Sequence, residues 1–370
     1  MGNLFIRNLN EKDTDSFTSE TGLILRRNLD KIFKKMCRAF TKVHILYLHL
    51  GEGMTDDNYF QTLDRGYIPA ETYDIRKNKN NIIVERYPVL TPDEPYIFVC
   101  NHTCPEDIET VLNVLDRNAY LVLGSVESLR NNPEMYLSFL NGMIPFDILD
   151  QKQRRELIQK MERVLQTNSI LIFPEGSHNY NPNLLINPLY DGPVNVALST
   201  NRKIVLVTML KDQKKNISYI DISNPLDVKE IKVDLPSEYQ GKKEKAYVQA
   251  LSSTIRNKMA TAVYAIMERH FLMVERKGQD SLEERMRSEK IEDAFRKLKW
   301  NKDVFEAEYL TKKTKADQEH EEVISTLSHL AIYSRTLDAD SRRYWIQRKI
   351  QMDKKNVVVR MREYLTNMKA

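Results

Sequence analysis

Short apolar runs alternate with amphipathic stretches between residues 80 and 225. Runs such as "YIFVC", "AYLVLG", "SILIF" and "KIVLVTML" are typical of strands buried inside a sheet. The stretches between them, such as "KQRRELIQKMERVLQTN", place apolar residues three or four positions apart, which is typical of helices. We expect this alternation to form an α/β domain with a mainly parallel central sheet flanked by helices.

An earlier segment, residues 22–40, predicts a strongly amphipathic helix whose polar positions are basic rather than of mixed charge. Such a helix either packs its apolar side on a core or lies on an anionic membrane surface, and the pattern alone leaves both open. The apolar positions are Leu25, Leu29, Ile32, Phe33, Met36 and Phe40; the basic ones are Arg26, Arg27, Lys31, Lys34, Lys35 and Arg38.

The chain changes character after residue 228. A helix is expected from Val248 to Ile266, with an apolar side that packs back on the sheet, and the charged chain beyond Arg276 predicts further helices. We therefore expect three parts. They are an N-terminal helical, membrane-associating segment (1–79), the α/β domain (80–275) and a charged helical C-terminal extension (276–370).

Composition limits the function classes. The 56 Lys and Arg against 52 Asp and Glu leave a net charge of only +4, which argues against a nucleic-acid partner. The three cysteines show no disulfide framework, which favours a reducing compartment. Because no signal peptide or membrane-spanning run is apparent, we expect a cytoplasmic protein, peripheral on the inner face of a membrane.

The candidate chemistry begins in "NHTCPED", directly after the apolar run "YIFVC". This stretch predicts a strand-to-helix loop with His102 at the sheet edge and Asp107 at the helix start. A carboxylate there fixes the imidazole tautomer and leaves the other ring nitrogen as a base, which is a catalytic triad without its serine. The alternative is that Asp107 caps the helix and His102 is an ordinary loop residue.

A second polar block, "FPEGS", also follows an apolar strand, about 70 residues downstream. Since parallel strands end at the same edge of a sheet, we expect Glu175, Gly176 and Ser177 to lie near His102.

Four blocks together resemble the glycerolipid acyltransferases of the lysophosphatidic acid acyltransferase (PlsC-like) superfamily. The first is Asn101, His102 and Asp107; the second is "GMIPFD", from Gly142 to Asp147; the third is "FPEGS", from Phe173 to Ser177; the fourth is "IVLV", from Ile204 to Val207. All four occur in the family's order.

The resemblance implies an O-acyltransferase of phospholipid biosynthesis. It would move a fatty acyl group from acyl-CoA or acyl carrier protein to a hydroxyl of a glycerol phosphate, a lysophospholipid or a related lipid acceptor. His102 would be the general base, oriented by Asp107, with no metal and no cofactor beyond the acyl donor. The substrate-binding positions it implies are Asn101, Gly142, Pro145, Asp147, Glu175, Gly176, Ser177 and His178.

Two departures bear on the acceptor. Ile148 and His178 stand where the family usually has arginines, which are thought to hold the acceptor's phosphate. Lys152, Arg154 or Arg155 would have to replace them, or the acceptor lacks a phosphate there.

Three other interpretations stay open. In the first, Glu175 serves only as a hydrogen-bond partner of the loop backbone. Cys100 and Cys104, which flank His102, permit a metal site or a thiol nucleophile. In the third, the fold is a catalytically lapsed acyltransferase that binds lipid or protein.

Overall fold

The protein is described by a computed structural model over residues 18–56, 59, 68, 70–104, 106–123, 140–146, 151–176, 186–212, 215–233 and 243–270. Its helices are α3 (Glu20–Thr41), the 3-10 helix η2 (Ala70–Thr72), α5 (Asp107–Val114), α8 (Gln151–Val164), α9 (Gly192–Thr200) and α10 (Lys243–His270). Its strands are β1 (Val43–Tyr47), β2 (Asn80–Arg86), β3 (Ile97–Cys100), β4 (Ala119–Leu123), β5 (Met143–Pro145), β6 (Ser169–Ile172), β7 (Ile204–Asp212) and β8 (Ile217–Ile222).

The strands form one sheet in the order β1-β2-β8-β7-β3-β6-β4-β5. Every neighbouring pair is parallel except β7 and β8, which run antiparallel. The expected α/β fold with a mainly parallel sheet is therefore confirmed. Strands β7, β3, β6, β4 and β5 share one direction, so their carboxyl ends lie at a common edge.

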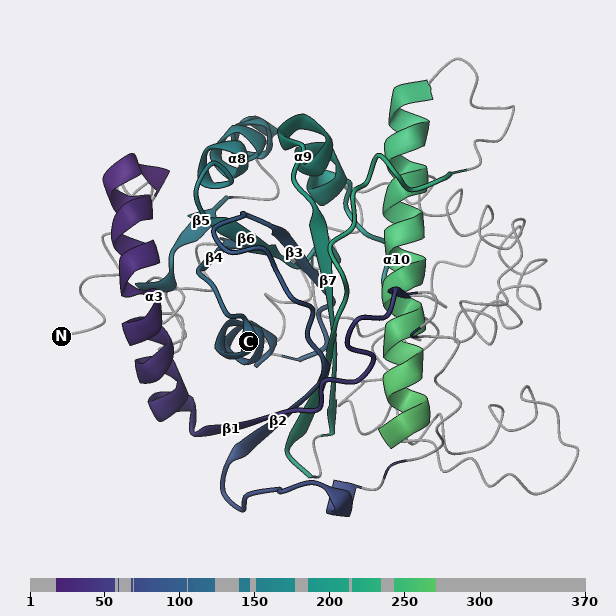
Figure 1. Ribbon diagram of the computed structural model, residues 1–370. Coiled ribbons are helices and arrows are strands. Elements are labelled where there is room, and N and C mark those ends of the chain that lie inside the picture. Colours follow the sequence, from purple (N-terminus) through teal and green to yellow (C-terminus); the bar gives the residue numbers. More distant parts are fainter. Residues whose placement is uncertain are drawn as a thin grey trace, which may run out of the picture.

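Helices cover both faces of this sheet (Figure 1). Helices α8, α9 and α10 pack on one face, where alternate side chains of the strands join theirs in one apolar cluster. The other face packs against α5 in a second cluster. The strand residues of both clusters are almost completely buried because the sheet is covered on both sides.

Two strands lie outside the sequence expectation. The edge strand β1 pairs with β2, so the segment expected to be helical over residues 1–79 contributes a strand to the sheet as well as the helix α3. The three-residue strand β5 pairs with β4. It is too short to show any periodicity in the sequence. The proposed domain boundaries at 79 and 275 stay predictions, and residues 276–370 lie outside the described part of the chain.

The amphipathic helix α3 packs differently from the expectation. Its core-facing residues are Leu23, Phe33 and Cys37, together with the buried ion pair of Lys34 and Asp30 at 2.8 Å. The expected apolar face is thus divided. Phe33 turns inward, whereas four of its neighbours on the apolar side are 43 to 58 % exposed, and the Phe40 side chain lies outside the described residues. The exposed four are Leu25, Leu29, Ile32 and Met36.

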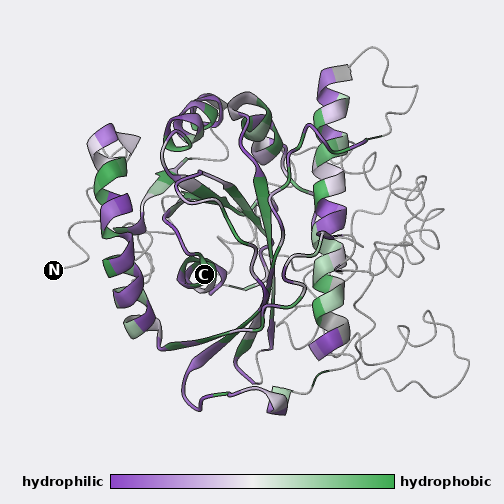
Figure 2. Ribbon diagram, viewed as in Figure 1, coloured by the Kyte–Doolittle hydropathy of each residue, from purple (hydrophilic) through white to green (hydrophobic). Residues whose placement is uncertain are grey.

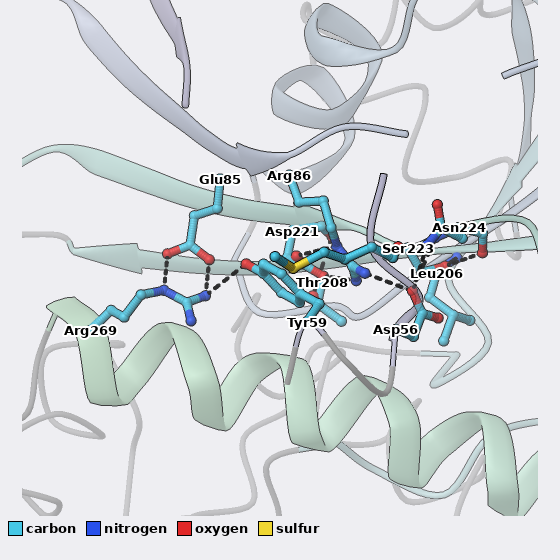
Figure 3. A network of polar contacts seen from close by, with 11 residues as sticks. Asp56, Tyr59, Glu85, Arg86, Leu206, Thr208, Asp221, Ser223, Asn224 and Arg269 are labelled. Atoms are coloured by element: carbon cyan, nitrogen blue, oxygen red, sulfur yellow. Dashed lines mark hydrogen bonds and ion pairs between the residues drawn. The ribbon is translucent and has the colours of Figure 1, made fainter. Parts of the chain in front are cut away.

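An irregularity in β2 buries two consecutive charged residues. The register between β2 and β8 shifts between Val84 and Arg86, which is the mark of a β-bulge. Arg86 donates to both oxygens of Asp221 on β8, at 2.9 and 2.7 Å, and to Asp56 at 2.6 Å. Glu85 is fully buried beside it, and Figure 3 shows Arg269 reaching it from α10.

Glu85 anchors the last turn of α10. Its oxygens accept hydrogen bonds from Arg269, at 2.7 Å from Nε, and lie 2.5 Å from His270 Nε2. The His270 ring also stacks on Tyr219 of β8, with 3.9 Å between centroids. Burial by itself would raise the pKa of Glu85, but Arg269 and His270 lower it to about 2.

We expect Glu85→Gln to lower the free energy of unfolding by about 3–5 kcal/mol, because it leaves the Arg269 guanidinium buried against a neutral amide. Urea unfolding at pH 7 measures this. The pKa of Glu85 is lowered in the native state, so its contribution is complete above pH 4.5 and is lost as the pH falls toward 2. The difference between wild type and variant should therefore shrink below pH 4.5.

The matched control is Glu230→Gln, which makes the same change at an exposed position and should leave the unfolding curve unchanged. Equal stability of Glu85→Gln and wild type at pH 7 would show that the network does not hold α10.

Candidate active site

The loop after β3 is attached to β7 by a side chain. Asn101 follows the last residue of β3, and its amide donates to Met209 O at 2.9 Å and accepts from Met209 N at 2.7 Å. The Asn101 amide therefore takes the place of a backbone amide and continues the strand pairing by one step. This contact fixes where the loop begins.

His102 and Asp107 come together at the start of α5. His102 Nδ1 lies 3.1 Å from Asp107 Oδ2, and the Asp107 side chain is completely buried. A carboxylate at this distance holds the proton of a neutral imidazole on Nδ1, which leaves the Nε2 lone pair as a base. The His102 ring packs against Phe173, with 4.8 Å between centroids, and its side chain is 16 % exposed.

Asp107 is held by the loop rather than capping the helix. Its carboxylate accepts hydrogen bonds from the backbone N–H of Thr103 and Cys104, and also from the Thr103 hydroxyl and the Cys104 thiol. The N-cap residue of α5 is Glu106, which makes no side-chain capping bond. The alternative in which Asp107 merely caps the helix is therefore wrong, and the same carboxylate orders both the loop and His102.

Glu175 connects this loop to a second segment. Its Oε1 accepts the backbone N–H of His102 at 2.8 Å, and its Oε2 accepts that of Asn187 at 2.6 Å. The side chain is almost fully buried. Burial raises the pKa of Glu175 to about 8, while these two hydrogen bonds and the Arg256 charge act in the lowering direction. The hydrogen bonds give Glu175 a role in the loop backbone; contact with an acceptor stays a prediction.

Gly176 follows in a turn that a larger residue does not fit. Its φ is +75°, and a Cβ there would meet the Tyr190 ring at 2.5 Å. Tyr190 in turn donates its backbone N–H to Pro174 O at 2.8 Å. Burial raises the pKa of Tyr190, and the charge of Arg154 from α8 acts against it. Arg154, one of the basic residues on α8, therefore interacts electrostatically with Tyr190, whose ring lies against Gly176.

The second sequence block is only partly near His102. Pro145 ends β5 at the common carboxyl edge, where it pairs with Leu123. It is three strands from β3, or roughly 14 Å across the sheet. Gly142 lies before β5, and a Cβ there would meet Tyr120 at 2.7 Å and Arg26 of α3 at 2.8 Å. The structure therefore places Gly142 at a helix contact, not beside His102.

Three of the residues implied by the resemblance, Asp147, Ser177 and His178, lie outside the described residues, as does Ile148. The three cysteine thiols, Cys37, Cys100 and Cys104, are free and buried. Within the described ranges, no group of three or more His, Cys, Asp or Glu side chains is arranged to hold a metal ion. Burial raises the pKa of the Cys100 and Cys104 thiols, which makes neither a ready nucleophile.

Sequence reasoning missed the groups that support the two carboxylates. Thr103 and Cys104 hold Asp107 through their backbone, while Asn187 and Arg256 stand beside Glu175. Residues 103 and 104 lie between His102 and Asp107 in the sequence, so their contact with Asp107 could have been predicted from this short spacing. Nothing in the sequence relates Asn187 or Arg256 to the loop after β3.

Comparison with known proteins gives one family match. Residues 78–210 match the family model described as Acyltransferase. This part of the chain is similar to acyltransferase domains. It contains His102, Asp107 and Glu175, and the resemblance to the glycerolipid acyltransferase superfamily is thereby confirmed. The match ends within β7, so α3, β1, β8 and α10 lie outside it.

Solved structures also match the chain, with low sequence identity. One of them is the crystal structure of the 1-acyl-sn-glycerophosphate (LPA) acyltransferase PlsC from Thermotoga maritima. The two chains are 15 % identical, the match covers 72 % of this chain and 95 % of that one, and the TM-score is 0.36. No curated protein sequence matches the chain.

Within the acyltransferase domain, Glu175 makes a testable contribution to stability. Its pKa is raised above the ordinary value of 4.5, so the native protein binds this proton more tightly than the unfolded chain. The resulting stability is complete below pH 4.5 and is lost as the pH rises through about 8. We expect Glu175→Gln to abolish this part of the pH dependence of the free energy of unfolding. The part that is lost is on the order of 1 kcal/mol or more.

Urea unfolding of both proteins at several pH values between 5 and 9 measures the effect, with the exposed Glu52→Gln as the control. Parallel pH curves for wild type and Glu175→Gln would mean that Glu175 does not titrate in this range.

Proposed function

We propose that the acyltransferase domain transfers a fatty acyl group from a thioester donor, acyl-CoA or acyl carrier protein, to a hydroxyl of a glycerol phosphate, a lysophospholipid or a related lipid acceptor. The observation that carries the proposal is the pairing of His102 with Asp107. It stands at a strand end, within the residues that match the acyltransferase family model. Acyl transfer to a hydroxyl needs a base of this kind.

The proposed reaction is direct. His102 Nε2 takes the proton of the acceptor hydroxyl, whose oxygen attacks the thioester carbonyl. The new carbon–oxygen bond forms, the carbon–sulfur bond breaks, and the imidazolium returns its proton to the leaving thiolate. Asp107 stabilises the imidazolium and keeps the ring in its tautomer, in the role that the carboxylate of a serine-protease triad plays.

The competing function is that of a catalytically lapsed fold that binds lipid or protein. Against it stands the number of donors that the Asp107 carboxylate accepts around the contact to His102. A loop that only packs against the sheet does not need a buried carboxylate aimed at an imidazole, because burial of a carboxylate is costly.

Thiol release from long-chain acyl-CoA and from acylated acyl carrier protein tests the activity. Each donor is offered with glycerol phosphate and with a panel of lysolipids that carry or lack a phosphate. We expect acceptor-dependent release that falls by at least about 100-fold in His102→Ala and in Asp107→Asn, because both remove the oriented base. The acceptors that support release also show whether a phosphate is needed despite Ile148 and His178.

The matched control is His49→Asn, at an exposed histidine whose positive φ asparagine also tolerates. Its activity should equal that of wild type. Absence of release from either donor with every acceptor, by folded protein that still binds lipid vesicles, would support the lapsed binding module instead.

We further propose that α3 binds an anionic membrane surface, which makes the protein peripheral on the membrane. The support is the apolar stripe of Leu25, Leu29, Ile32 and Met36, which stays exposed after α3 has packed on the domain. Lysines and arginines adjoin it, including the exposed Lys31 and Lys35. Such an arrangement suits the boundary between headgroups and acyl chains. In the described part of the chain, every helix is too short or too polar to cross a bilayer.

We expect Ile32→Glu to weaken sedimentation with vesicles that contain anionic phosphatidylglycerol by about tenfold or more, because it removes an apolar side chain and adds a repelled charge. Val89→Glu is the control, since Val89 is 89 % exposed but lies outside α3. Unchanged binding of Ile32→Glu would exclude the stripe as the contact with the membrane.

A further inference from the structure

Helix α10 lies outside the family match, yet it reaches the segment that supports His102. Arg256, in the middle of α10, donates from Nε to Ile186 O at 2.8 Å. One turn earlier, the Ser252 hydroxyl donates to Asp191 at the start of α9, at 3.0 Å. These two contacts attach α10 to the chain between the glutamate turn and α9.

A continuous series of hydrogen bonds leads from Arg256 to the proposed base. Ile186 accepts the Arg256 bond through its carbonyl, and the next residue, Asn187, donates its N–H to Glu175 Oε2. The other oxygen of Glu175 accepts the N–H of His102. The Arg256 guanidinium is therefore one peptide unit away from the carboxylate that holds the backbone of His102.

The charge of Arg256 complements this geometry. Both Glu175 oxygens accept N–H groups, and such contacts favour the ionised carboxylate, which has no proton of its own. In the described part of the chain, the titratable groups that interact electrostatically with Glu175 include Arg256 on α10, Asp107 on α5 and Cys100 on β3. Arg256 is the cation of this set, and its charge interacts with Glu175.

We propose that Arg256 is a positioning residue for His102. Its hydrogen bond to Ile186 O places the N–H of Asn187 against Glu175, and its charge favours the ionised form of that carboxylate. The expected effect on the reaction rate rests on the proposed function. The link from Arg256 through Glu175 to His102 can be tested without any enzymatic activity. This role gives α10 a part in the site that the domain match does not include.

The kinetic test compares three variants of the full chain. Arg256→Met removes both charge and donor; Arg256→Gln keeps an amide donor at the same distance from the backbone but removes the charge; Arg256→Lys keeps the charge. We expect kcat to fall about 10- to 100-fold in Arg256→Met, with KM for donor and acceptor changed less than about twofold, because the base is misplaced. Lys should recover more activity than Gln. The exposed Lys245→Met on the same helix is the control.

A double-mutant cycle with Glu175→Gln separates positioning from general packing. If Arg256 acts through Glu175, Arg256→Met has little further effect on kcat once residue 175 is Gln. In the single variant Arg256→Met, which retains Glu175, the acid limb of the pH profile of kcat/KM should move upward by about half a pH unit or more. The reason is that Glu175 is harder to ionise without the charge of Arg256. Additive losses with an unmoved limb would overturn the proposal.

The second readout is the imidazole resonance of His102 in protein with ¹³C-labelled histidine, assigned by its absence in His102→Ala. We expect the His102 signal to move in Arg256→Met and in Arg256→Gln, at temperatures where both remain folded, and to stay in place in Lys245→Met. A His102 signal that is unchanged in both Arg256 variants would overturn the proposal. If no variant and no wild-type preparation shows thiol release, the proposed function fails, while this resonance still decides the role of Arg256.

Discussion

The buried carboxylate of Glu175 is the contact on which the arrangement of the site depends. It accepts one backbone N–H from His102 and one from Asn187, residues that are far apart in the sequence. Neither segment has regular secondary structure at these positions, so the carboxylate satisfies backbone groups that would otherwise be buried without a partner. The loop that carries the base therefore has a fixed position before any substrate binds.

A second carboxylate, Asp107, completes this order from the other side of His102. It accepts the N–H groups of Thr103 and Cys104 and faces His102 Nδ1. Glu175 thus fixes the backbone of His102, and Asp107 fixes its ring. A base held in both respects loses little entropy when the acceptor hydroxyl arrives, which is how positioning contributes to catalysis.

Buried charge accompanies the apolar packing of two further helices. Glu85 binds the end of α10 through Arg269 and His270, whereas Asp30 pairs with Lys34 within α3, on its buried side. For α3 the consequence is visible at the surface. Because the charged pair and Phe33 face inward, the most apolar stripe of the helix remains outside. Figure 2 shows how hydrophilic and hydrophobic residues alternate along both helices.

The sequence by itself determined the α/β class and the buried strands of the motif region that are long enough to show a pattern, and it indicated the pairing of His102 with Asp107. These follow from local periodicity and from a spacing of five residues across one strand-to-helix loop. It also indicated that Glu175 lies near His102, because both follow parallel strands.

Only the tertiary structure decided the partners of Glu175, the contact of Gly142 with α3, the strands β1 and β5, and the face on which α3 packs. Each of these depends on which distant segments meet. A β-bulge buries Glu85 and Arg86 together, and a long helix brings Arg256 to Ile186. Local pattern does not encode such meetings, because they are set by how the helices and the sheet pack.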